Sequence, residues 1–140
     1  MKTSFKILFP FVIYVISSFT AYAQTGRFYT TDGGLSSSLI NHFFQDSKGF
    51  MWAATEYGLN SFDGLRFANY WHVSGDSTSI KNNYVRTLFE DSRQNLLIGC
   101  IDGLMRYDRE TNTFSEIPMI RAGKQVFPHV TQMQELHNGE

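Results

Sequence analysis

This sequence has little charge, one cysteine and no apolar run long enough to cross a bilayer. Charged residues make up 18% of its 140 residues and the formal net charge is −1, which gives no electrostatic basis for binding nucleic acid or an anionic membrane. Because Cys100 is the only cysteine, an internal disulfide and a cysteine-based metal cluster are excluded. Cys100 stands within an apolar run, which predicts a small buried side chain.

The amino terminus has the pattern of a secretory signal peptide. Lys2 and Lys6 precede the uncharged apolar run Ile7–Phe19, and Ala21-Tyr22-Ala23 places small residues at the −3 and −1 positions of a cleavage site. The alternative is a membrane-spanning anchor, but the apolar run is shorter than the roughly 20 residues that a bilayer requires. The sequence therefore predicts a signal peptide at residues 1–23 and a mature chain in the periplasm.

Aromatic residues and an internal repeat are what the sequence has in abundance. Aromatic residues make up 16% of the chain, with 13 Phe and 7 Tyr, which suits strands buried on both faces and argues against disorder. The stretch Asp46–Asp63 recurs without a gap as Asp91–Asp108, a shift of 45 residues. A fixed period of this size indicates one supersecondary unit per repeat. The identical pairs are Asp46/Asp91, Ser47/Ser92, Gly58/Gly103, Leu59/Leu104 and Asp63/Asp108.

Each repeat is predicted to contain four antiparallel strands. The spacing of Ile40, Phe43 and Phe44 also fits a helix, as in solenoids of paired helices. Short apolar runs, frequent turn residues and the tight-hairpin signal Asp63-Gly64 favour strands instead. The expected strands are 39–45, 50–55, 59–62 and 65–71 in the first repeat, and 84–90, 96–100, 104–107 and 113–117 in the second.

The segments on either side of the two repeats extend the pattern. Ahead of them, the β-prone run Arg27–Thr31 is either a strand that completes the last repeat of a closed ring or a plain amino-terminal arm. Behind them, a third copy begins, because Val130 matches Val85 at the same 45-residue spacing. The copy stops before its most apolar strand, and we therefore expect the chain to be the amino-terminal piece of a longer protein.

The first repeat resembles the two-component regulator propeller repeat, whose pattern is Asp-x-x-Gly-x-apolar-Trp-small-small-Thr-x-x-Gly-Leu. The matching residues are Asp46, Gly49, Trp52, Thr55, Gly58 and Leu59. The second repeat matches at Asp91, Gly99, Gly103 and Leu104, but has Gln94, Leu97 and Cys100 at the Gly, Trp and Thr positions. The resemblance implies an all-β fold of four-stranded antiparallel propeller blades with period 45, present here as an incomplete amino-terminal fragment of a larger propeller. The expected divisions are 1–23 signal peptide, 24–38 strand or arm, 39–82 first blade, 83–124 second blade and 125–140 start of a third.

The resemblance also implies a function for the parent protein. Such repeats form the periplasmic sensor of hybrid two-component histidine kinases, many of which respond to oligosaccharides and control genes for glycan use. The implied partners are an oligosaccharide, the remaining blades and a second copy in a homodimer, with the parent anchored in the inner membrane. Catalysis would lie in the missing carboxy-terminal region, so this segment is not expected to be an enzyme. The alternative is a secreted propeller hydrolase or lyase acting on glycans.

No catalytic, cofactor or metal-binding residue is expected in this segment. The four histidines, His42, His72, His129 and His137, show no ligand spacing. The repeated aspartates Asp46/Asp91 and Asp63/Asp108 are expected to bind the backbone of their own turns. Trp52 could stack on a sugar, but its apolar strand favours packing between blades. The exposed aromatic candidates for ligand contact are Tyr57, Trp71 and Tyr84.

Overall fold

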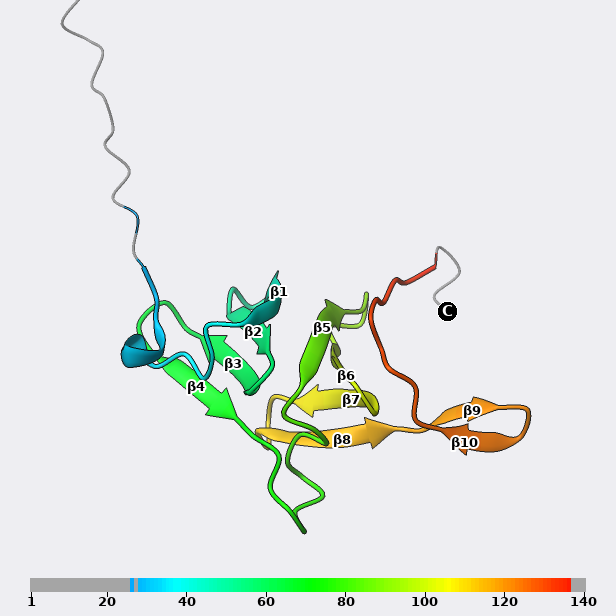
Figure 1. Ribbon diagram of the computed structural model, residues 1–140. Coiled ribbons are helices and arrows are strands. Elements are labelled where there is room, and N and C mark those ends of the chain that lie inside the picture. Colours follow the sequence, from blue (N-terminus) through cyan, green and yellow to red (C-terminus); the bar gives the residue numbers. More distant parts are fainter. Residues whose placement is uncertain (1–25, 27, 137–140) are drawn as a thin grey trace, which may run out of the picture.

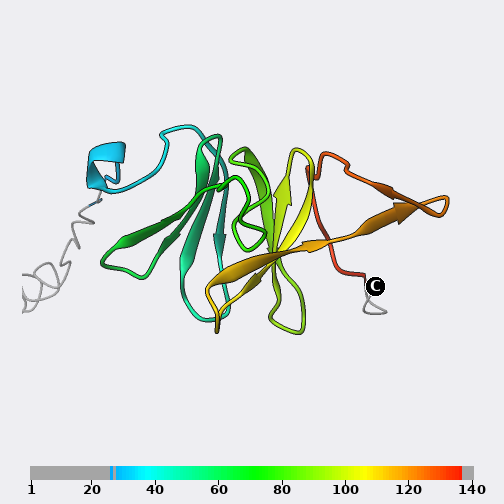
Figure 2. The ribbon, with the colours of Figure 1, turned by 90° about the horizontal axis from the view of Figure 1, so that it is seen from below.

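The computed structural model describes residue 26 and residues 28–136, whose regular elements are β-strands and one turn of 3-10 helix, joined by turns and loops (Figure 1). Two four-stranded antiparallel sheets, which we call blade 1 and blade 2, stand side by side (Figure 2). Blade 1 contains β1 (Ile40–Gln45), β2 (Met51–Thr55), β3 (Gly58–Phe62) and β4 (Phe67–Tyr70). Blade 2 contains β5 (Val85–Glu90), β6 (Leu96–Cys100), β7 (Gly103–Asp108) and β8 (Thr113–Ile117). The all-β prediction and its eight strands are confirmed.

Repeated residues make the same turns in both blades. Between the first two strands, Asp46 Oδ1 accepts the Lys48 and Phe50 N–H groups, each at 2.9 Å. Asp91 Oδ1 accepts the corresponding bonds from Arg93 and Asn95 in blade 2, at 3.0 and 2.8 Å. These bonds occupy backbone donors that the sheet leaves unpaired. The repeated aspartates are therefore turn residues, as predicted.

The repeated glycine after the second strand is required by the backbone. Gly58 has φ of 111° and Gly103 has φ of 151°, a region that other residues rarely adopt. A Cβ atom on Gly58 would also lie 2.6 Å from the Tyr70 carbonyl oxygen. A side chain at this position would therefore strain the turn and push the outermost strand away from the sheet.

The core of the described residues lies between the two blades. Trp52 and Leu59 from blade 1 are almost fully buried against apolar side chains of blade 2. Cys100 belongs to the same core, and its burial raises the pKa of its thiol to about 12, so it is the buried filler that the sequence predicts. The blade 2 members are Val85, Leu88, Leu96, Ile98, Cys100, Met105 and Phe114.

A glutamate in each following repeat accepts hydrogen bonds from the turn serine of the repeat before it. Glu90, at the end of β5, accepts the Ser47 N–H at 2.6 Å and the Ser47 hydroxyl at 3.0 Å. Glu135 makes the same two bonds to Ser92, at 2.8 and 2.6 Å. Residues 127–136 form no strand, yet they hold the register of a third copy: Glu135 lies 45 residues after Glu90 and Val130 is 8% exposed.

A β-hairpin after blade 2 was not predicted. Strands β9 (Met119–Arg121) and β10 (Lys124–Val126) pair in antiparallel fashion, so the division predicted between residues 124 and 125 falls inside β10. Ala122 and Gly123 form the turn at φ of 50° and 75°. Two-residue turns of this kind usually contain Asn-Gly or Asp-Gly, and alanine gives no such signal.

The amino-terminal arm is not a strand in its described part. Residues 28–30 are irregular, and Thr31–Gly33 forms the 3-10 helix η1, with the Gly33 N–H bonded to the Thr30 oxygen. The β-prone composition therefore misleads here, because local turn bonds occupy the backbone. Tyr29 packs against Phe62 and Phe67 at centroid distances of 4.9 and 5.6 Å. The ring-closing role of the arm stays a prediction.

Tyr29 nevertheless packs on blade 1 in the way that Tyr70, a residue of the outermost strand β4, packs on blade 2. In blade 2, Tyr107 and Phe114 are the cross-strand pair that corresponds to Phe62 and Phe67 in blade 1. Tyr70 from β4 packs against that pair at 5.8 and 5.2 Å. The arm thus covers blade 1 in the way that β4 covers blade 2.

Residues 24–140 expressed alone are expected to self-associate. The face of blade 1 that points away from blade 2 contains an apolar hollow, with Phe43 57% exposed and Met51 38% exposed. Exposed apolar surface and open strand edges promote association. Analytical ultracentrifugation combined with thermal melting tests this expectation. A sharp cooperative transition from a soluble monomer would show instead that the two blades form a self-sufficient domain.

Candidate functional site between the two blades

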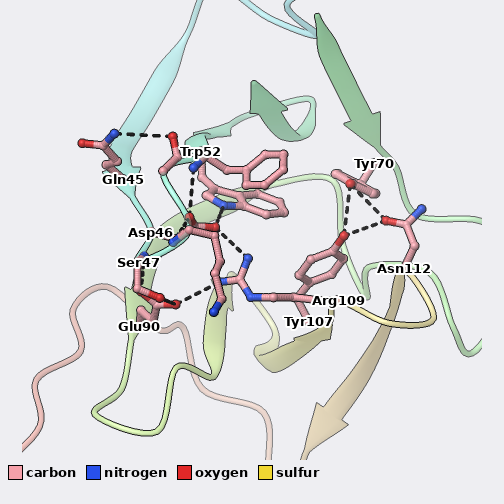
Figure 3. Close-up of polar contacts among 12 residues, drawn as sticks. Gln45, Asp46, Ser47, Trp52, Tyr70, Glu90, Tyr107, Arg109 and Asn112 are labelled. Carbon is pink, nitrogen blue, oxygen red and sulfur yellow. Dashed lines mark hydrogen bonds and ion pairs between the residues drawn. The ribbon is translucent and has the colours of Figure 1, made fainter. Parts of the chain in front are cut away.

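A cluster of charged side chains, which we call the clasp, joins the β1–β2 turn of blade 1 to the β7–β8 turn of blade 2 (Figure 3). Asp46, in the β1–β2 turn, is 4% exposed, and its Oδ2 atom accepts bonds from Trp52 Nε1 and Arg109 Nη1, both at 2.7 Å. Arg109 comes from the β7–β8 turn of blade 2, and its Nη2 atom binds Glu90 Oε1 at 2.9 Å. Because Glu90 also holds Ser47, these residues form one continuous network across the interface.

The network keeps Asp46 ionised. Burial by itself would raise the pKa of this carboxyl group, since it disfavours the charged form. The hydrogen bonds from Trp52, Arg109 and the Phe50 N–H, together with the Arg109 charge, outweigh burial and lower the pKa below its ordinary value. Asp46 is therefore a fixed anion at neutral pH, and the clasp has no proton to exchange there.

Two tyrosines lie beside the clasp. Tyr70 stacks on Trp52 at 5.9 Å, and Tyr107 meets the indole edge-on at 5.0 Å. Both hydroxyls donate to Asn112 Oδ1, at 3.1 and 2.7 Å (Figure 3). Burial, and then the hydrogen bond with Tyr70, raises the pKa of Tyr107. Both hydroxyl protons are therefore already bound within the protein.

The clasp fits a structural role. Its cavity of about 160 Å³ is smaller than the roughly 300–1,000 Å³ of ordinary ligand pockets. Asp46 already accepts four hydrogen bonds, and Arg109 is paired with the two carboxylates of Asp46 and Glu90. The prediction that Trp52 packs between blades agrees with its 2% exposure. The residues lining the cavity are Lys48, Phe50, Trp52, Ser61, Tyr70, Tyr107 and Arg109.

The histidines that the structure describes are separate from one another. His42 Nδ1 accepts the Leu88 N–H at 3.0 Å, and His72 Nδ1 lies 3.0 Å from the Ile80 oxygen. Within residues 26 and 28–136, no group of three or more His, Cys, Asp or Glu side chains is placed to hold a metal ion. His137 lies outside the described residues.

The three aromatic candidates for ligand contact come together at the β2–β3 turn. Tyr57 lies within this turn and is 67% exposed. Trp71 is 49% exposed and adjoins Gly58, since a Cβ atom there would lie 3.0 Å from its Cδ1 atom. The Tyr84 hydroxyl donates to Glu56 Oε1 at 2.9 Å. We call this group, Tyr57, Trp71 and Tyr84, the aromatic turn.

Sequence reasoning did not find the clasp. Arg109 has no counterpart in blade 1, because the position 45 residues earlier is Gly64. No repeat signal therefore marks Arg109. The bonds of Glu90 and Glu135 could have been inferred, since both residues occupy the same repeat position and each stands opposite a repeated Asp-Ser turn.

Comparison with known proteins shows which proteins this chain resembles. Residues 34–57 match the model of the two-component regulator propeller family. A stretch of 77 residues is 35% identical to "Histidine kinase P4" of Formosa agariphila, covering 52% of this chain and 6% of that protein. The chain thus spans a small part of its relative's length.

Solved structures agree with the family match. The extracellular domain of the hybrid two-component system BT3049 from B. thetaiotaomicron superposes with a TM-score of 0.70 at 30% identity, over 81% of this chain and 16% of that domain. The extracellular domain of the hybrid two-component system BT4673 from the same organism gives a TM-score of 0.57 at 27% identity, over 71% of this chain and 14% of that domain. This chain therefore contains a match to the two-component regulator propeller repeat at residues 34–57, and its two four-stranded sheets resemble parts of these extracellular domains.

Proposed function

We propose that this chain is the extracytoplasmic ligand-sensing segment of a hybrid two-component histidine kinase, that its ligand is an oligosaccharide, and that the parent controls genes for glycan use. The similarity to extracellular domains of hybrid two-component systems and to a histidine kinase supports the sensor role. The segment binds the ligand, and the kinase reaction belongs to another part of the parent protein. The parent acts as a homodimer anchored in the inner membrane.

The aromatic turn is the feature that supports an oligosaccharide as the ligand. Aromatic rings present flat apolar faces with polar edges, and Tyr57 and Trp71 expose such surface, with exposed fractions of 67% and 49%. Neither residue repeats 45 positions later, where Asp102 and Glu116 stand near the corresponding turn. Side chains that the repeat does not require are free to serve a ligand.

The experiment uses the full-length parent in a reporter strain together with its purified sensor domain. A panel of oligosaccharides is screened for binding by calorimetry and for induction of the reporter. We expect Trp71→Ala and Tyr57→Ala each to weaken binding by about tenfold, because a stacked aromatic contributes about 1 kcal/mol beyond its buried area. Phe28→Ala is the control, since Phe28 is 94% exposed and lies on the arm.

One result would count against the sensor role, and another against the aromatic turn as its ligand site. Release of new reducing ends from a glycan by the purified protein would support a secreted propeller enzyme. Equal binding by the wild type and both aromatic variants would move the ligand away from the aromatic turn. Transcript levels of neighbouring glycan-use genes, with and without the bound sugar, test the control of transcription.

The export signal is expected to be cleaved between Ala23 and Gln24. Ala21 and Ala23 fit the small-residue positions of a signal peptidase site, and both lie outside the described residues. Amino-terminal sequencing of the exported protein should begin at Gln24 or at the pyroglutamate formed from it. Recovery of peptides containing Lys2 from membrane-bound protein would instead show an uncleaved anchor. Within the described residues, no helix is long and apolar enough to span a membrane.

A further inference from the structure

A groove of about 500 Å³ runs along the first strands of the two blades and the segment that follows blade 2. Strands β1 and β5 lie next to each other, with the segment 127–136 beyond them (Figure 1). Six polar residues line the groove, and they occupy two adjacent positions of the repeat in three successive copies. The first position holds Asn41, Arg86 and Thr131, and the second holds His42, Thr87 and Gln132.

A repeated β-bulge directs the first of these positions into the groove. In blade 1 the pairing of β1 with β2 shifts between Ile40 and His42, which leaves Asn41 unpaired. In blade 2 the pairing of β5 with β6 shifts between Val85 and Thr87, which leaves Arg86 unpaired. A bulge re-aims a side chain at the cost of a ladder bond, and such bulges occur often beside functional sites.

The two groove positions differ from the repeated positions inside the blade. Some interior or turn positions keep their residue from copy to copy, as Asp46/Asp91 and Gly58/Gly103 do, and others change it, even from polar to apolar, as Thr55/Cys100 does. The groove positions stay polar in all three copies but change side chain each time. A row of polar side chains that differ from copy to copy offers different groups along the groove, which suits a ligand that is itself asymmetric.

The groove offers hydrogen-bond donors and a positive charge. Because the Leu88 N–H donates to His42 Nδ1, the neutral imidazole carries its proton on Nε2, which is available as a donor. Arg86 lines the groove and lies 5.7 Å from the ring centroid of Tyr84, a member of the aromatic turn. Among the described residues the ion pairs involve Lys81 and Arg109, not Arg86. Among the residues that the structure describes, no acidic one lines the groove.

We propose that this groove binds an anionic saccharide, with a carboxylate or sulfate group of the sugar at Arg86 and its hydroxyls at the amide, imidazole and hydroxyl groups of the neighbouring positions. The inference rests on the proposed sensing of oligosaccharides and specifies the chemical class of the ligand. Arg86 suits this role because a guanidinium presents paired donors that match a carboxylate or sulfate. Its place beside Tyr84 makes the groove continuous with the aromatic turn, so one chain of sugars can contact both.

The test is a glycan array of uronic-acid, sulfated and neutral oligosaccharides, probed with the complete sensor domain, followed by calorimetry on the acidic sugars that bind. Matched methyl esters of the uronic-acid oligosaccharides remove the charge and leave the skeleton unchanged. We expect Arg86→Gln to weaken binding of the acidic sugar by about tenfold to a hundredfold, the range for a charged hydrogen bond. Arg66→Gln is the control, because Arg66 is exposed in the β3–β4 turn.

Three further results complete the test. Arg86→Lys should retain part of the affinity that Arg86→Gln loses, and thermal melting should show both variants folded. Affinity of the wild type should fall with added salt more steeply than that of Arg86→Gln. The uronic-acid and sulfated arms of the array identify which anionic group is bound.

The opposite outcomes separate this inference from the sensor proposal. Binding of neutral sugars alone, or an Arg86→Gln variant that binds the acidic sugar as tightly as the wild type, would overturn the groove while leaving an oligosaccharide sensor in place. Binding of no saccharide of any class would overturn both proposals.

Discussion

Replacement of Trp52 by alanine is expected to lower the free energy of unfolding of the complete propeller by about 3–5 kcal/mol, the range for large aromatic-to-alanine changes in a core. Trp52 is 2% exposed and packs between Tyr70 of its own blade and Tyr107 of the next. Its removal leaves a cavity at the interface of the two blades and deprives Asp46 of one of its donors. Denaturant unfolding followed by circular dichroism measures the loss.

Trp71 is the matched control, since it is the second of two tryptophans and is 49% exposed. Trp71→Ala should cost about 1 kcal/mol or less, because less apolar surface leaves the core. The two variants should therefore lose different properties: Trp52→Ala should lose stability, and Trp71→Ala should lose the response to ligand. A Trp52→Ala protein that keeps its full stability but no longer responds to ligand would place Trp52 in the binding site.

Most of the fold could be predicted because the repeat supplies the same information twice. The turn residues Asp46 and Asp91, and the glycines Gly58 and Gly103, bound each strand by backbone requirements that are local in sequence. Because these turns are fixed, the first and last residues of the apolar strands between them could be predicted closely. A repeated pattern also fixes which blade positions face a neighbour, which is why the burial of Trp52 could be predicted.

The segments outside the repeat were predicted less well, because their structure depends on contacts and not on pattern. The run Arg27–Thr31 has the composition of a strand, but a strand needs a partner. Residues 28–30 instead pack by Tyr29 against Phe62 and Phe67. The turn between β9 and β10 contains Ala122 at positive φ, and an alanine in the sequence does not predict such a turn.

The clasp and the groove illustrate two different limits of sequence reasoning. Arg109 reaches Asp46 across 63 residues of chain, and the position 45 residues before Arg109 is Gly64, so neither proximity nor repetition indicates the contact. The groove residues do repeat in position, but their polar character becomes informative only once the bulges at Asn41 and Arg86 show where these side chains point.

Removal of the Asp46 carboxylate is expected to be as costly as the loss of Trp52. Asp46→Ala should lower the free energy of unfolding by about 3–5 kcal/mol, the cost of removing one partner from a buried ion pair. The variant leaves Arg109, whose side chain is 25% exposed, without one of its two carboxylates, and leaves the Trp52 N–H without an acceptor. It also frees the two N–H groups that Asp46 binds within its own turn.

Asp91 provides the internal control for this change. Asp91 binds two N–H groups of its own turn in the same way, but its second oxygen is held by Asn95 and not by an arginine or a tryptophan of the interface. Asp91→Ala should therefore cost about 1–2 kcal/mol, which is the turn contribution alone. The difference between the two variants isolates the contribution of the clasp. Equal losses would mean that the bonds to Trp52 and Arg109 add nothing to stability.

The stability that Asp46 supplies should also depend on pH. Its pKa is lower in the folded protein than the ordinary value of 3.8, so the unfolded chain binds the proton more tightly. The contribution is therefore complete well above pH 3.8 and is lost as the pH falls through the lower folded value. Comparing unfolding of the wild type and Asp46→Asn between pH 7 and pH 2 tests this sign. The gap between the two proteins should stay constant down to about pH 5 and shrink below about pH 4. A gap that widens on acidification would show that Asp46 is protonated in the folded propeller.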